Sequence, residues 1–173
     1  MSALFPSDLV ARAERFLDRA RRAGLHVATA ESCTGGLVAG LLTEIAGSSD
    51  VLDRGFVTYS NEAKAEMLGV PIELVRRHGA VSPEVARAMA EGALAHSTAD
   101  IAVAVTGIAG PGGATPAKPV GLVEFACARR NGPTPLVTKR FDKADRTRIR
   151  LLAVETALGL LEQAIEAPTG APR

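Results

Sequence analysis

The amino-acid sequence predicts an α/β fold, a three-layer α/β/α sandwich with a mixed, mostly parallel sheet. Short apolar runs that are typical of buried strands alternate with segments of helical periodicity. The run at 101–105 is apolar throughout, which indicates a strand buried on both faces, so we expect helices on both sides of the sheet. Two strand-like segments near the carboxyl end are joined by a short turn, which predicts an antiparallel pair.

The first elements are a helix, a strand and a second helix. After Ser7, apolar residues recur at helical spacing, and Gly24 is a typical helix stop. Residues 26–30 read as a short buried strand. Residues 37–45 follow as a helix rich in Leu, Val and Ala. A glycine-containing turn therefore connects this strand to this helix.

The middle of the chain predicts another strand and two helices. Residues 55–59 form the strand, and residues 61–68 form the helix that follows it. Ser82 and Pro83 start the next helix, which we expect to run to about Ser97. A Ser side chain can accept a bond from an orphan N–H group, and Pro suits the first helical position.

The last part of the chain contains the apolar strand at 101–105, a long loop, a hairpin and a final helix. Residues 106–119 include four glycines and three prolines, which prevent regular structure and indicate a surface loop. Residues 121–129 and 136–140 are the two hairpin strands, and Asp145 starts the last helix.

The length of 173 residues fits one domain, which we place at residues 1–167. Residues 168–173 are expected to be a mobile tail. A hydrophobic fraction of 47% and a charged fraction of 23% are typical of a soluble globular protein. The apolar and weakly charged helices would permit self-association, so a homo-oligomer is a further expectation.

Composition argues against several classes of partner. A net charge of +1 and an aromatic fraction of 3% give neither a basic footprint nor stacking platforms, so no nucleic-acid partner is expected. No membrane partner is expected either, because the chain shows neither a signal peptide nor an apolar run of spanning length. Cys33 and Cys127 lack the spacing of a metal site or a disulfide framework, which favours a reducing, cytoplasmic setting without a bound metal.

Three strand ends carry the residues that could do chemistry. Ligands of open α/β sheets bind beyond the carboxyl ends of the strands, where Ser32, Tyr59 and Thr106 all fall. Ser32 is therefore a candidate nucleophile, although capping the next helix is the ordinary role of a serine before such a turn and Gly-x-Ser-x-Gly is not matched. Cys33 is the rival nucleophile, with a small buried thiol as its alternative role.

Lys64 is the candidate base for Ser32. It falls in the first turn of a predicted helix, where the positive end of the helix dipole would lower the pKa of its amine, and burial would lower that pKa further. A neutral Lys64 could take the proton of Ser32, and Tyr59 could relay protons or orient the amine. The ordinary alternatives are a solvated lysine and a tyrosine that packs at a sheet edge.

The glycine-rich loop is either a connector or an anion site. Its glycines would let backbone N–H groups approach a phosphate or an oxyanion, and the loop does not match an NTP-hydrolysing P-loop. Arg146 and Arg150 lie one helical turn apart and could bring positive charge to the same cleft, with solvent exposure as the alternative.

Five segments in this order resemble the CinA carboxy-terminal domain family, whose standalone members include nicotinamide-nucleotide amidohydrolases. They are Ala-Glu-Ser-Cys-Thr-Gly-Gly at 30–36, Tyr-Ser-Asn-Glu-Ala-Lys at 59–64, Gly-Ala-Val-Ser at 79–82, Thr-Gly-Ile-Ala-Gly-Pro-Gly-Gly at 106–113 and Lys-Pro-Val-Gly at 118–121. The resemblance covers nearly the whole chain. It implies an α/β/α fold and the conversion of nicotinamide mononucleotide to nicotinate mononucleotide and ammonia, without a metal or an organic cofactor.

The resemblance also implies roles for individual residues. Ser32 resembles the nucleophile, Lys64 the base and Tyr59 the hydrogen-bonding or proton-relay partner, in a reaction that passes through a serine acyl-enzyme. The residues expected to bind the small nucleotide substrate are Thr34, Gly35, Gly36, Asn61, Thr106, Gly107, Gly110, Gly112, Gly113 and Arg146. Two alternatives stay open, namely a nucleotide-binding or regulatory module without turnover and an amidase for another small amide.

Overall fold

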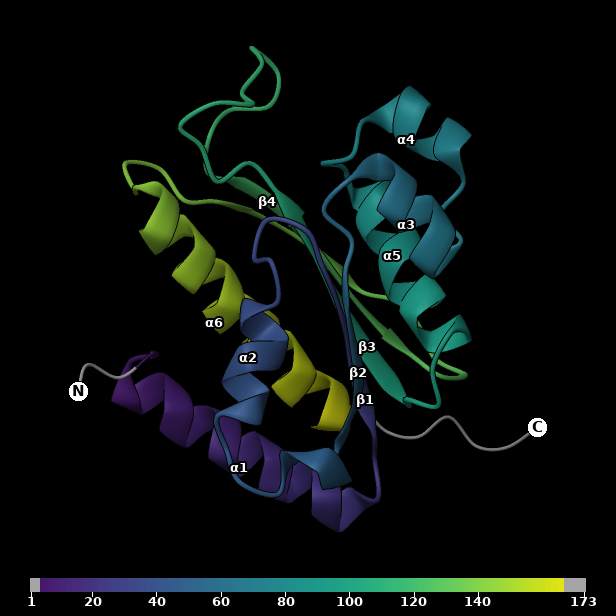
Figure 1. Cartoon of the computed structure of the whole chain (residues 1–173), viewed down its shortest axis with the longest axis vertical. Helices are drawn as coiled ribbons and strands as arrows, with labels where there is room; N and C mark the ends of the chain where they lie inside the picture. The colour runs from purple at the N-terminus through teal and green to yellow at the C-terminus, as the bar shows by residue number, and fades with distance from the viewer. Residues whose placement is uncertain (1–3, 167–173) are drawn as a thin grey trace.

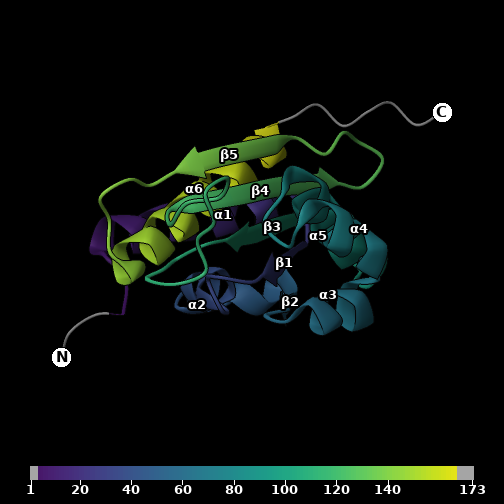
Figure 2. The same ribbon diagram turned by 90° about the horizontal axis from the view of Figure 1, so that it is seen from above.

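The computed structural model describes residues 4–166 and has the predicted three layers. A five-stranded sheet in the order β2-β1-β3-β4-β5 lies between helices on both of its faces (Figures 1 and 2). The strands are β1 (Val27–Glu31), β2 (Leu52–Val57), β3 (Ile101–Gly107), β4 (Leu122–Arg129) and β5 (Leu136–Arg140). β1 is parallel to β2 and to β3, and β4 is antiparallel to β3 and to β5. Four strands therefore run in one direction and β4 in the other, which confirms the mostly parallel sheet and its hairpin.

The helices divide between the two faces as the sequence predicted. One face is covered by α1 (Ser7–Ala23), α2 (Leu37–Thr43) and α6 (Arg146–Glu166), and the other by α3 (Asn61–Leu68), α4 (Ile72–His78) and α5 (Pro83–Ala95). The short 3-10 helix η1 (Ser48–Asp50) precedes β2. Figure 2 shows the two groups of helices on opposite sides of the sheet.

The central strand β3 explains why two cores form. Its side chains alternate between the faces, so that Val103 and Val105 pack with α1 and α6 while Ala102 and Ala104 pack with α5. The small alanines let α5 lie close to the sheet. All residues of β3 before Gly107 are buried, as the continuous apolar run predicted.

Some element boundaries differ from the sequence prediction. β2 covers Leu52–Val57 and not 55–59, because its pairing with β1 begins at Leu52 and ends where Val57 lies opposite Glu31. Charged residues in the first half of this exposed edge strand interrupt the apolar pattern from which the strand was predicted. The short helix α4 was not predicted, since seven residues after Pro71 hold too few turns for a periodic signal. α5 ends at Ala95, slightly earlier than expected.

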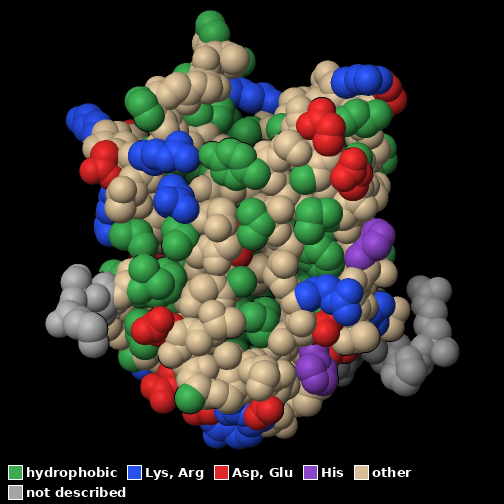
Figure 3. Space-filling view, viewed as in Figure 1, with side chains coloured by type: hydrophobic (Ala, Val, Ile, Leu, Met, Phe, Trp, Pro, Cys, Tyr) green, Lys and Arg blue, Asp and Glu red, His purple; other side chains and the backbone are tan. Residues whose placement is uncertain are grey.

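β2 forms an exposed edge of the sheet. Figure 3 shows hydrophobic side chains down the middle of the face that is seen in Figure 1, and the exposed large hydrophobics include Val57 on β2 and Met67 on α3. The expected self-association of the chain stays a prediction. Between residues 4 and 166, none of the helices combines the length and the apolar character needed to cross a membrane. The predicted tail at 168–173 and the outer limits of the predicted domain lie outside the described residues.

Candidate active site

A pocket of about 240 Å³ opens at the carboxyl ends of β1 and β3. The loop that follows β3 and contributes to its lining projects from the top of the molecule in Figure 1. Four of the sequence motifs meet there. The pocket is lined by Ser32, Cys33, Tyr59, Asn61, Lys64, Ala80, Val81, Thr106, Gly107, Ile108, Ala109, Gly110, Gly112, Gly113 and Arg146. The convergence of strand ends that the sequence predicted is thus present in the fold.

Ser32 and Lys64 are brought together. The Lys64 Nζ lies 3.2 Å from the Ser32 Oγ, within hydrogen-bonding distance. Ser32 directly follows β1, and its N–H group donates to the carbonyl oxygen of Val105 on β3. The side chain of Ser60 caps α3 by accepting from the N–H group of Ala63, so Lys64 lies at the start of this helix. Side chains in a helix lean toward its N-terminus, which directs the amine back to the strand ends.

The surroundings of the Lys64 amine favour its neutral form. The side chain is only 1% exposed, and burial lowers the pKa of this amine below its ordinary value of 10.5, although the negative charge of Glu62 opposes this. The amine also donates to the carbonyl oxygens of Thr58 at 2.8 Å and Ser60 at 3.4 Å. A neutral amine has two N–H groups and one lone pair, so these carbonyls leave the lone pair for the Ser32 hydroxyl.

Glu31 holds the turn that carries Ser32. Its side chain is fully buried, and its carboxylate accepts from the N–H groups of Gly36 at 3.1 Å, Val38 at 3.0 Å and Ala39 at 3.0 Å. These N–H groups lie at the start of α2, where orphan donors and the helix dipole favour a negative charge. Sequence reasoning missed this role. A signal was present, because an acidic residue at the end of a buried strand needs donors nearby.

Arg150 holds the same turn from α6. Its Nε donates to the carbonyl oxygen of Cys33, and its Nη2 donates to that of Thr34, each over 3.1 Å. Arg150 was expected to bring positive charge to the cleft. Its side chain instead holds the turn after Ser32 and does not line the pocket. Glu31 and Arg150 together fix the turn that follows Ser32.

Tyr59 lines the pocket but makes no hydrogen bond to Ser32 or Lys64. Its side chain is 60% exposed, and its hydroxyl accepts a hydrogen bond from Arg146 Nη2 at 3.2 Å. β2 ends before Tyr59, and the carbonyl oxygen of the preceding Thr58 faces Lys64. Backbone carbonyls therefore orient the amine, the function that sequence reasoning gave to the phenol. Arg146 is held at the pocket by a second bond, from Nη1 to the carbonyl oxygen of Gly110 at 2.6 Å.

The turn at Thr34, Gly35 and Gly36 does not line the pocket. The N–H group of Gly35 donates to the Ser32 carbonyl oxygen and that of Gly36 to Glu31, so neither is available to a substrate oxyanion. Thr34 is fully buried. The structure therefore gives these three residues a role in shaping the turn and no contact with the pocket.

The glycine-rich loop after β3 does line the pocket. Within residues 4–166 the N–H groups of Ala109, Gly110, Gly112 and Gly113 donate to no protein acceptor. Ala109 and Gly110 are buried, and buried N–H groups are rarely left without a partner. Asn61 and Gly107 also reach the pocket, whereas the hydroxyl of Thr106 is already donated to the carbonyl oxygen of Ala80 at 2.8 Å.

Cys33 is a buried thiol. Burial, with a smaller contribution from the negative charge of Glu31, raises the pKa of its side chain to about 12. The thiolate, which is the reactive form, is therefore disfavoured near neutral pH. Within the described range of the chain, no group of three or more His, Cys, Asp and Glu side chains is arranged to hold a metal ion.

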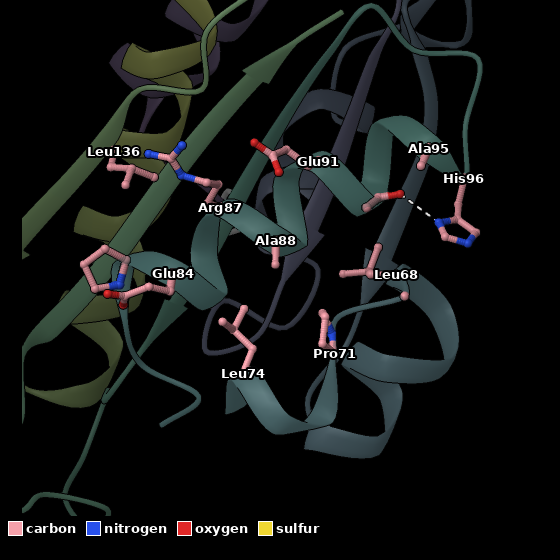
Figure 4. A pocket seen from close by; sticks show the side chains of 13 residues that line it. Leu68, Pro71, Leu74, Glu84, Arg87, Ala88, Glu91, Ala95, His96 and Leu136 are labelled. Atoms are coloured by element: carbon pink, nitrogen blue, oxygen red, sulfur yellow. Dashed lines mark hydrogen bonds between the residues drawn. The ribbon is translucent and has the colours of Figure 1, made fainter. Parts of the chain in front are cut away.

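A larger hollow of about 800 Å³ lies away from this chemistry, between α3, α4 and α5 (Figure 4). Its lining is mostly apolar, with Leu68, Leu74 and Leu136 around it, and His96 lies 2.9 Å from the carbonyl oxygen of Gly92. The lining holds neither Ser nor Cys nor Lys. The smaller pocket beside Ser32 is therefore the better candidate for catalysis.

Comparison with known proteins shows which family the chain belongs to. Residues 10–165 match the family model of the CinA C-terminal domain. The chain belongs to the CinA C-terminal domain family. This confirms the resemblance that the five sequence segments carry.

Two curated CinA-like proteins show how far the likeness extends. The CinA-like protein of Akkermansia muciniphila is 54% identical over 139 residues, which are 80% of this chain and 33% of that protein. The CinA-like protein of Anaeromyxobacter dehalogenans is 53% identical over 142 residues, which are 82% and 34% of the two chains. The chain thus spans about a third of the length of the curated relatives that it matches.

Solved CinA structures share the fold along nearly all of this chain. The competence/damage inducible protein CihA from Agrobacterium tumefaciens is 54% identical, with a TM-score of 0.92 over 96% of this chain and 100% of its own. The CinA superfamily protein from Escherichia coli is 34% identical, with a TM-score of 0.86 over 94% of each chain. The chain is accordingly a CinA-family protein whose relatives carry the competence/damage-inducible name.

Proposed function

We propose that this CinA domain is a nicotinamide-nucleotide amidohydrolase, which converts nicotinamide mononucleotide to nicotinate mononucleotide and ammonia through an acyl-enzyme on Ser32. The observation that carries the proposal is the buried Lys64 amine, 3.2 Å from the Ser32 hydroxyl, with a lowered pKa. A serine is a weak nucleophile until a neighbouring base takes its proton. The family resemblance supplies the substrate class.

In the first half-reaction, Ser32 Oγ attacks the carboxamide carbon while its proton passes to Lys64 Nζ. The carbonyl oxygen of the substrate becomes an oxyanion, and the unpaired N–H groups of Ala109 and Gly110 are the donors that we assign to it. The C–N bond then breaks, and Lys64 returns the proton to the departing nitrogen. Ammonia leaves, and a nicotinoyl ester remains on Ser32.

In the second half-reaction, water attacks the ester carbon. Lys64 takes a proton from this water as the oxyanion forms again. The ester bond to Ser32 breaks, the proton passes from Lys64 to Ser32 Oγ, and the carboxylic acid that is released loses its own proton to water to give the carboxylate product. One base therefore serves both steps, which is consistent with its single position beside the hydroxyl.

Arg146 is the group that we assign to the phosphate of the substrate. It lines the pocket, and its hydrogen bonds to Tyr59 and to the Gly110 carbonyl oxygen fix the direction of the guanidinium. A guanidinium forms charge-assisted hydrogen bonds with phosphate oxygens. The expected partner is thus a small nucleotide, and the Tyr59 hydroxyl belongs to this phosphate end of the pocket.

The test measures ammonia and nicotinate mononucleotide from purified protein and nicotinamide mononucleotide. Wild type should release both products in equal amounts, and Ser32→Ala or Lys64→Met should lower kcat by about a thousandfold or more, since nucleophile and base act as a unit. Lys139→Met, which removes an exposed lysine on β5, is the matched control and should keep activity.

Other outcomes of this assay would contradict the proposal. Near-normal turnover by Ser32→Ala would exclude the acyl-enzyme. A shift of the melting temperature with the nucleotide, without product, would favour a nucleotide-binding or regulatory module. Faster release of ammonia from glutamine or free nicotinamide would favour an amidase for another small amide.

A further inference from the structure

Four consecutive carbonyl oxygens before α5, at residues 78–81, each accept a hydrogen bond from a side chain. The donors are Ser82 Oγ to Gly79 at 2.9 Å, Thr106 Oγ1 to Ala80 at 2.8 Å, and Lys118 Nζ to His78 at 2.5 Å and to Val81 at 2.6 Å. Most of this connection lies outside helices and strands, so side chains take the place of a backbone ladder. Lys118 supplies two of the four bonds.

The connection forms one wall of the candidate active site, because Ala80 and Val81 line the pocket. Gly79 shows how closely Lys118 approaches it. A Cβ at Gly79 would lie 2.8 Å from the Lys118 Nζ, and the backbone has a φ of +81° there, which disfavours other residues. Glycine therefore leaves the space that the amine occupies.

Lys118 itself belongs to the loop between β3 and β4, whose glycines line another part of the pocket. Thr115 and Lys118 exchange backbone hydrogen bonds of 2.9 and 3.1 Å, which close a turn around the lysine. The N–H group of Gly121 donates to the carbonyl oxygen of Ile108, which closes the base of the loop. Lys118 thus joins two pocket-lining segments that are distant in sequence.

We propose that Lys118 is a positioning residue that fixes the distance between the connection at 79–81 and the glycine-rich loop, and so shapes the pocket for its substrate. Lys118 does not line the pocket, so it acts through Ala80, Val81 and the loop. The proposal accounts for two of the five family segments, 79–82 and 118–121, to which the Ser32–Lys64 chemistry gives no role. Its kinetic part rests on the proposed function.

The first test needs no substrate. Hydrogen–deuterium exchange is followed by mass spectrometry in wild type, Lys118→Met, Lys118→Arg and the control Lys139→Met. Lys118→Met should exchange about tenfold faster in peptides that cover 78–82 and 108–117, because two charge-assisted bonds are lost, while α1 should stay unchanged. Lys118→Arg keeps the donors and should lie between Lys118→Met and wild type. Unchanged exchange in both segments of Lys118→Met would overturn the proposal.

The second test separates positioning from a general loss of stability. With nicotinamide mononucleotide, Lys118→Met should raise KM by about tenfold and change kcat by no more than about twofold, because the reacting pair is untouched. A tenfold fall in kcat, with KM unchanged, would contradict the proposal. If wild type releases no ammonia from this nucleotide, the proposed function fails, and the exchange experiment still decides the role of Lys118.

Failure to fold has its own control. Lys118→Gln keeps most of the side-chain length and an N–H donor, and it replaces Lys118→Met in both tests if circular dichroism shows that the Met variant is unfolded. Unfolding of both variants would overturn the proposal, since the role would then concern the whole domain.

Discussion

Arg150 on α6 donates a hydrogen bond of 3.1 Å from its Nε to the carbonyl oxygen of Cys33, the residue after Ser32. The two residues are 117 positions apart in the chain. The last helix thereby fixes the turn that carries the candidate nucleophile, and Nη2 of the same side chain holds Thr34 in the same way. Arg150 is accordingly a positioning residue for Ser32.

Replacing Arg150 should impair chemistry more than binding. Arg150→Met removes both bonds to the turn, and a displaced Ser32 should lower kcat by about tenfold to a hundredfold with little change in KM. Steady-state kinetics with nicotinamide mononucleotide measure this, with Arg148→Met on the same helix as the control. A rise in KM at unchanged kcat would show instead that Arg150 contributes to substrate binding.

Cys33 should be dispensable. Its burial and its pKa of about 12 keep the thiol protonated near neutral pH, so Cys33→Ala should retain ammonia release within about threefold of wild type. Cys33→Ala and Ser32→Ala are assayed side by side. A loss in Cys33→Ala as large as that in Ser32→Ala would identify the thiol as the nucleophile.

Arg146 should discriminate substrates by their phosphate. Arg146→Met should raise KM for nicotinamide mononucleotide by about tenfold or more, because a charge-assisted bond is lost, and leave KM for the nucleoside without phosphate unchanged. The ratio of the two KM values in wild type and variant is the measurement. An equal rise in KM for both substrates would show that Arg146 does not bind the phosphate.

The burial of Lys64 should make stability depend on pH. The folded chain holds this proton less tightly than the unfolded chain, whose lysine has the ordinary pKa of 10.5, so the unfolded state binds more protons between the two pKa values. Unfolding free energy therefore rises with pH across that window, by about 1.4 kcal/mol for each unit by which the pKa is lowered.

Urea unfolding of wild type and Lys64→Met at several pH values measures this dependence. The difference in unfolding free energy should move in favour of wild type as the pH is raised toward 10.5. A difference that stays constant, or that moves in favour of the variant, would show that the Lys64 amine does not have a lowered pKa in the folded chain.

Much of the fold and the meeting of Ser32 with Lys64 could be predicted from local patterns. The apolar run of β3 and the helix start at Ser82 are readable within a few residues, and the strand ends place Ser32 and Lys64 at one edge of the sheet. The expected lowering of the Lys64 pKa is also found, with burial as its cause.

The features of the site that the sequence did not predict depend on contacts between segments far apart in the chain, or on the course of the backbone. The bonds from Arg150 to the turn after Ser32 join segments distant in sequence, and no local pattern shows them. Charged, exposed residues in β2 obscure the pattern that would show that the strand ends at Val57. The exposure of Tyr59 and the hydrogen bond from Lys64 to the Thr58 carbonyl oxygen could therefore not be predicted. The glycines at 35 and 36 looked like an anion site because sequence alone does not show that their N–H groups are already used.

The most direct test of the account is the titration of the Lys64 amine by nuclear magnetic resonance, with its signal assigned by comparison with Lys64→Met. We expect a midpoint below the ordinary value of 10.5, so that a neutral amine is available to take the Ser32 proton. A midpoint at or above 10.5 would contradict the account, because Lys64 would then be a charged donor and Ser32 would lack its base.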